Sequence, residues 1–90
     1  MARMDVLSGK PTEYAAQGER SDALFELGLD YCTGREGTFD LIQAHKWFNL
    51  AAVRGNDDAK RYRAEVASDM SKADIIRAQK LAREWLASMH

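Results

Sequence analysis

From Ser21 onward, apolar residues recur every three or four positions, which is the spacing of one face of an α-helix. Residues that favour helix caps interrupt this pattern at Asp40, Asn56 and Ser71. The sequence predicts four helices. The first starts after Ser21 or Asp22, either of which is a suitable N-cap, and runs to about Thr33; the others run from Asp40 to a C-cap at Gly55, from about Asp57 to Asp69, and from Ser71 to the end of the chain. No stretch alternates β-branched residues as a strand does, so the predicted class is all-α.

The first predicted helix has two apolar stripes. One stripe contains Leu24, Leu27 and Tyr31, and the other contains Phe25, Leu29 and Cys32. A helix that is apolar on two sides needs a neighbour on each side. For the second stripe two alternatives stay open: the N-terminal residues cover it, or it is exposed to a partner or to a second copy of the chain.

In the second predicted helix, the apolar face is broad and centres on Ala44, Trp47 and Phe48. His45 falls on the opposite side, beside Lys46, and is therefore expected on a polar surface. At Asp40, Gln43 follows three residues later and completes the pattern of a capping box, in which the two side chains bond to each other's backbone.

Residues 1–20 lack a helical period and contain Gly9, Pro11 and Gly18, so we expect a loose N-terminal arm. Residues 21–90 form the expected domain. The arm has no apolar core of signal-peptide length, and no later run is long enough to cross a membrane. These features predict a cytoplasmic protein without membrane contact.

The 13 basic and 14 acidic residues are interleaved along the chain, and the net charge is −1. The densest basic run, from Lys60 to Arg63, is flanked by Asp58 and Glu65. Nucleic-acid binding normally requires a face of one sign, so the balance argues against it. A single cysteine excludes an internal disulfide.

A repeat underlies the four helices, because Ala44 and Trp47 recur as Ala82 and Trp85, 38 positions later. The first unit contains a longer set of small and aromatic residues at fixed spacing: Ala23, Leu27, Gly28, Tyr31, Gly34, Gly37, Asp40, Ala44, Trp47, Ala51, Ala52, Gly55 and Ala59. This set resembles the Sel1-like repeat, whose pattern is A…LG..Y..G.G…D…A..W…AA..G…A. Ala23 and Ala59, each at the start of a helix, are 36 positions apart. In this 36-residue register the second unit is degenerate, since Arg63, Ala64 and Ala67 correspond to Leu27, Gly28 and Tyr31 of the first.

The resemblance implies a short α-solenoid of two helix-turn-helix hairpins, similar to tetratricopeptide repeats. It also implies a non-catalytic module that contacts other proteins, such as a small adaptor or regulator, and that needs no cofactor. A purely structural domain that forms weak homo-oligomers is an alternative. The residues that we assign to partner binding are Phe25, Leu29, Trp85, Leu86, Met89 and His90.

An enzyme or redox protein is a further alternative, and Cys32 and His45 are its only candidate pair. No third group is placed to orient the histidine, so we expect no catalysis. Neither HxxxH nor CxxC spacing occurs, and we expect no metal site.

The C-terminal sequence REWLASMH contains the apolar residues Trp85, Leu86 and Met89, followed by His90. Trp85 and Leu86 suit the core, whereas Met89 and His90 lie beyond the last turn that must pack. Two hypotheses remain: these residues complete the packing, or they are a handle that an ATP-dependent protease or chaperone binds.

Overall fold

The computed structural model describes residues 20–88, and this part of the chain is helical without strands. Its elements are α3 (Ser21–Thr33), the short 3₁₀ helix η1 (Arg35–Gly37), α4 (Leu41–Val53), α5 (Asp57–Ala67) and α6 (Lys72–Ala87). The all-α class and the four predicted helices are confirmed. Most of the expected N-terminal arm lies outside the described residues, as do Met89 and His90.

Three helices begin at the side-chain caps that the sequence predicts. The Asp40 carboxylate accepts hydrogen bonds from the backbone N–H groups of Ile42 and Gln43, at 3.0 and 3.1 Å. Asn56 and Ser71 accept in the same way, from the N–H groups three residues ahead of them. Each cap pairs a donor that the first helical turn would otherwise leave without a partner.

Local details differ from the expectation at three places. Only half of the capping box forms, because the Asp40 N–H donates to the carbonyl of Tyr31 at 3.0 Å rather than to Gln43. Helix α3 begins directly after Arg20, so neither Ser21 nor Asp22 is its cap. Helix α5 ends at Ala67, two residues before the predicted end at Asp69.

Glycine ends α3 and makes the turn after α4 possible. Gly34 has φ +78°, and its N–H donates to the carbonyl of Asp30 at 3.1 Å. Gly55 has φ +101° and directly follows Arg54. Arg54 is the C-cap of α4, so the prediction that Gly55 is this cap is a fourth local difference. These left-handed conformations are strained for residues with a Cβ atom, and they reverse the chain between antiparallel helices.

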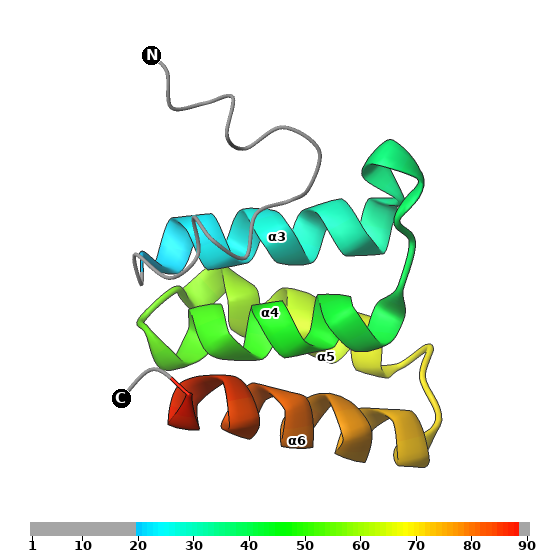
Figure 1. Ribbon diagram of the computed structural model, residues 1–90. Helices are drawn as coiled ribbons and strands as arrows, with labels where there is room; N and C mark the ends of the chain where they lie inside the picture. Colours follow the sequence, from blue (N-terminus) through cyan, green and yellow to red (C-terminus); the bar gives the residue numbers. More distant parts are fainter. Residues whose placement is uncertain (1–19, 89–90) are drawn as a thin grey trace.

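Consecutive helices run in opposite directions, and α4 lies between α3 and α6 with α5 behind it (Figure 1). Helix α4 has extensive contacts with each of the other three helices. The expected second hairpin does not form a close pair, because α5 and α6 have few contacts with each other and each packs on α4 instead. Helix α4 is therefore the centre of the domain.

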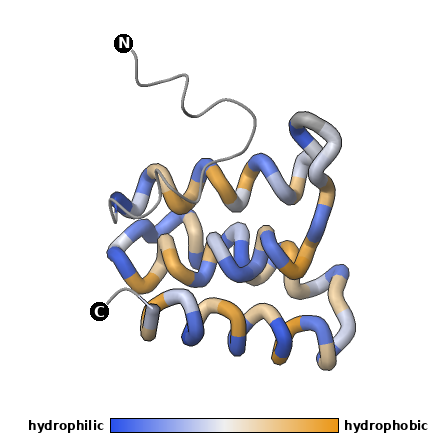
Figure 2. Tube along the Cα trace, viewed as in Figure 1, coloured by the Kyte–Doolittle hydropathy of each residue, from blue (hydrophilic) through white to orange (hydrophobic). Residues whose placement is uncertain are grey.

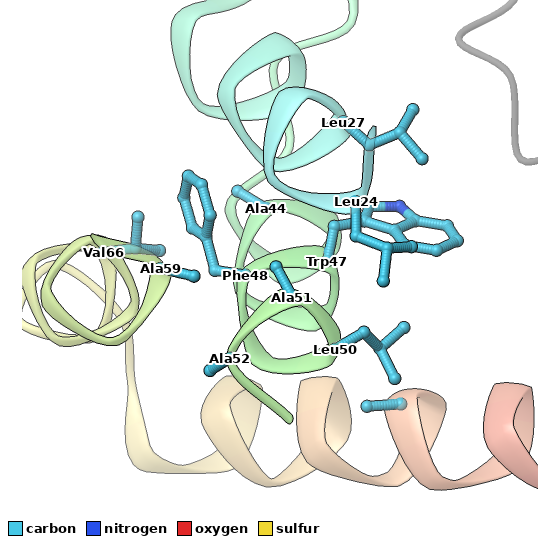
Figure 3. Close-up of a cluster of buried hydrophobic side chains, with 11 residues drawn as sticks. Leu24, Leu27, Ala44, Trp47, Phe48, Leu50, Ala51, Ala52, Ala59 and Val66 are labelled. Atoms are coloured by element: carbon cyan, nitrogen blue, oxygen red, sulfur yellow. The ribbon is translucent and has the colours of Figure 1, made fainter. Parts of the chain in front are cut away.

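The two large aromatic residues of α4 point to opposite flanks of the helix (Figure 3). Phe48 points toward Val66 of α5, whereas Trp47 lies beneath Leu24 of α3. Both aromatic side chains are fully buried. Phe48 also contacts α3 closely, since a Cβ atom on Gly28 would lie 2.5 Å from its ring atoms Cδ1 and Cε1. Gly28 thus allows the backbone of α3 to approach this ring.

The prediction that His45 and Lys46 lie on an exposed polar face is wrong. His45 is 3% exposed and Lys46 is 8% exposed. A periodicity argument assumes that one side of a helix stays in water, but α4 has neighbours on three sides. Its nominally polar face is covered by other parts of the protein.

Candidate functional site

The residues assigned to partner binding on α3 are partly buried against the core. The ring of Phe25 lies 5.6 Å from that of Phe48 and 5.1 Å from that of Tyr62, the latter edge-on. Leu29 and Cys32 also pack against the core cluster. The second apolar stripe of α3 is therefore at least partly covered within the domain, and Phe25 is held by rings from α4 and α5.

The residues assigned to partner binding on α6 form a different group. Trp85 packs edge-on against Trp47, with ring centroids 5.4 Å apart and an angle of 80° between the planes. Leu86 is partly buried beside the same core. Because Trp47 and Phe48 point to opposite flanks of α4, the structure places Trp85 and Phe25 in separate aromatic clusters rather than in one patch.

Cys32 and His45, the candidate catalytic pair, are both shifted toward their neutral forms. Burial raises the pKa of the Cys32 thiol. Burial also lowers the pKa of the His45 imidazole, and the positive charge of Arg63 lowers it further. A cysteine nucleophile needs the opposite shifts, because its reactive form is a thiolate that a nearby positive charge stabilises.

A polar contact that the sequence analysis missed joins α4 to α5. The Arg63 guanidinium donates a hydrogen bond to the side-chain oxygen of Asn49, 14 residues away in the chain. The charge of Arg63 also acts on His45, one turn before Asn49. His45 and Asn49 are four residues apart and therefore lie on one side of α4. The sequence does not show that Arg63 is their partner, because this depends on where α5 packs.

Lys46 also has a role that the sequence pattern did not indicate. Its ammonium nitrogen lies 4.2 Å from the centre of the Trp47 ring, within the range of a cation–π contact. The Trp47 indole nitrogen is buried and has no hydrogen-bond partner among the described residues. The cation–π contact and the buried indole nitrogen therefore belong to the packed centre of the domain rather than to an exposed site.

Exposed residues lie on the outer sides of α3, α5 and α6. On α3 they include Asp22 and Glu26, and on α6 they include Ile76, Lys80 and Arg83, all of which are exposed. Ile76 is 56% exposed, which is unusual for so large an apolar side chain. Phe39 and Val53 are also exposed, in the loop before α4 and at the end of α4.

Residues 20–88 contain no group of three histidine, cysteine or acidic side chains arranged to hold a metal ion. In the same part of the chain, no helix combines the length and the apolar character needed to cross a bilayer. No model of a known protein family matches the sequence, and neither a curated protein nor a solved structure matches it.

Proposed function

We propose that this protein is a non-catalytic protein–protein interaction module, built as a short helical-repeat unit of the Sel1-like type. The observation that carries the proposal is that α3 and α6 lie on opposite sides of α4 and that each packs mainly on α4 (Figure 1). Each of these two helices therefore keeps a long outer face in water, whereas its aromatic side chains pack against the core. Helical-repeat proteins bind partners through such helix faces.

The packing of the repeat residues supports the resemblance over α3 and α4. Gly28 lies against the Phe48 ring, and Ala44 and Ala51 are fully buried on α4. Small residues at these positions let helix backbones approach closely. The few contacts between α5 and α6 agree with a second unit that is degenerate in sequence. The proposal is accordingly one full repeat followed by an incomplete one.

A more specific form of the proposal is a cytoplasmic adaptor or regulator whose partner is an ATP-dependent protease or chaperone. Its support is the apolar sequence REWLASMH. Helix α6 ends at Ala87 and Ser88 caps it, so its last turn is complete before Met89. The proposed contact is made by Met89 and His90, which follow this cap in the sequence.

The test is site-specific photo-crosslinking in cells. A photoreactive residue replaces Glu26 on α3 or Arg83 on α6, and a control replaces Glu65, which is exposed on α5. We expect discrete crosslinks to protein from the α3 or α6 position and not from the control. Equal, diffuse crosslinking from all three positions would count against an interaction module.

The enzyme alternative is tested by replacing its two candidate groups together, with Cys32→Ser and His45→Gln. Circular dichroism first establishes that the double variant folds, because both side chains are at least partly buried. The crosslinking pattern should then match that of the wild type. A folded double variant that loses its cellular effect but keeps the crosslinks would favour the enzyme.

A further inference from the structure

The two outer helices of the domain carry opposite charge. Helix α3 contains three carboxylates and no basic residue. Helix α6 contains four basic residues and two acidic ones. Asp22 and Glu26 are exposed one turn apart on α3, and Lys80 and Arg83 are exposed one turn apart on α6. Asp74 and Glu84 of α6 are exposed as well, so four basic and two acidic residues give this helix a net charge of +2, against −3 for the three carboxylates of α3. The near-neutral charge of the whole chain therefore combines the acidic outer face of α3 with an outer face of α6 that has a basic excess.

These faces lie at opposite ends of the molecule. Helix α4 lies between α3 and α6, which present Leu24 and Ala82, respectively, as buried residues of the core (Figure 1). The charged residues of each helix lie on its exposed side, so the two faces cannot neutralise each other within one chain. In Figure 2, hydrophilic and hydrophobic segments alternate along both helices, as expected for helices with one buried side.

Neighbouring residues offset the acidic face of α3 only weakly. Arg20 forms an ion pair with Asp22 at 2.9 Å, and Arg35 forms one with Asp30 at 3.1 Å. The Arg20–Asp22 pair is exposed on both sides and is therefore weak, whereas the Asp30 side chain is only 18% exposed, so Asp30 contributes less to the outer face than Asp22 and Glu26 do. Glu26 is exposed between the two pairs.

We infer that copies of this chain associate head to tail, with the basic outer face of α6 in one copy against the acidic outer face of α3 in the next. The inference rests on the proposed interaction function and names a second copy as the partner. Charge complementarity between two faces of the same chain selects this partner. The faces also match in length, because helices of 13 and 16 residues are about 20 and 24 Å long.

An apolar residue accompanies the charges on each face. On α6, Ile76 is exposed one turn before Lys80. On α3, Leu29 packs partly against the core and is partly exposed, about one turn after Glu26. A symmetric contact of α6 with α6, or of α3 with α3, would instead bring like charges together. The head-to-tail contact leaves one acidic and one basic face free after each addition, so the assembly grows instead of stopping at a dimer.

The experiment measures the mass of the full chain by sedimentation equilibrium over a range of protein concentrations. One variant reverses α6 with Lys80→Glu and Arg83→Glu, and a second reverses α3 with Asp22→Lys and Glu26→Lys. A matched control, Lys60→Glu with Arg61→Glu, makes the same change of net charge as the α6 variant at exposed positions of α5. Circular dichroism checks that every variant is helical.

For the wild type at an ionic strength of about 0.01 M, we expect the mass to rise with concentration beyond twice the monomer mass of 10.1 kDa. At about 1 M salt, where charges are screened within about 3 Å, it should return to the monomer value. Each reversed variant alone should remain monomeric, because its two outer faces then have the same sign. An equal mixture of the two variants should regain the growth, and the α5 control should behave as the wild type.

The inference is overturned if the wild type stays at the monomer mass throughout, if the mass stops at a dimer, or if the mixture of reversed variants fails to associate. Loss of association in the α5 control would also overturn it, because net charge rather than the α6 face would then be responsible. If reversal of the α3 charges unfolds the helix, the neutral variant Asp22→Asn with Glu26→Gln is measured in its place. This variant should show a smaller rise of mass with concentration than the wild type. A monomeric wild type that still forms discrete crosslinks to another protein would sink this inference and leave the proposed function standing.

Discussion

Replacing Gly28 by alanine adds a single methyl group at a close contact between α3 and the Phe48 ring of α4. The new Cβ atom would lie 2.5 Å from Cδ1 and Cε1 of the Phe48 ring and 3.0 Å from its Cγ. Carbon atoms normally approach to about 3.5–4.0 Å, so the ring or the helix must move by about 1 Å. The ring has little freedom to move, because it is fully buried and has Phe25 and Tyr62 beside it.

Two opposing effects set the size of the change. Alanine is a better helix former than glycine by about 1 kcal/mol, which stabilises the folded protein. Overpacking of a rigid core costs about 1–3 kcal/mol, and the shortness of this contact places it near the upper end. We therefore expect a net loss of about 2 kcal/mol in the free energy of unfolding. In a domain of this size the loss lowers the melting temperature by roughly 8–16 °C.

The assay is thermal and urea unfolding followed by circular dichroism, repeated in the background Phe48→Leu. Leucine lacks the ring atoms that the new methyl group meets. In that background Gly28→Ala should be neutral or stabilising by up to about 1 kcal/mol, which gives a coupling of about 2–3 kcal/mol between the two positions. Stabilisation of the wild-type protein by Gly28→Ala, or the same loss in both backgrounds, would refute the proposed contact.

Three further outcomes follow from the structure. Trp47→Ala should lower the free energy of unfolding by about 3–5 kcal/mol, because the fully buried indole leaves a cavity beside Trp85; a loss below about 1 kcal/mol in urea unfolding would contradict its central position. The pKa of His45 is lower in the folded protein than its usual value of 6.5, so the unfolded chain binds the proton more readily. Stability should therefore be constant above about pH 6.5 and fall as the pH drops below it, and melting curves of His45→Gln should lack this component. Removing Met89 and His90 should leave melting unchanged and abolish capture by an ATP-dependent protease or chaperone, whereas a destabilised truncation that still binds would exclude the handle.

Local sequence determined the helices of the described region and most of their ends. The caps at Asp40, Asn56 and Ser71 each act on a backbone group within three residues, and Gly34 ends α3 through its own backbone conformation. Helical periodicity likewise identified Trp47 and Phe48 as core residues. Such features depend on residues that are close together in the chain, so they can be predicted from the sequence.

The candidate binding surface could be predicted from the sequence less well than the helices. The apolar pattern selected Phe25 and Trp85, but their ring partners come from other helices and hold both residues partly inside the domain. In the sequence analysis, the charges of α3 and α6 entered only as nearly equal totals of basic and acidic residues. Only the placement of α4 between the two helices separates these charges into two faces.

Tertiary structure alone decided what covers α4. His45 and Lys46 have the spacing of an exposed helix face, yet both are buried because α4 has three neighbouring helices. The tertiary structure also determines that α5 and α6 have few contacts with each other. Both helices pack on α4, although only a short turn joins them. Periodicity shows which residues of a helix share a side, but the burial of that side depends on helices distant in sequence, whose positions follow from the packing of the whole core.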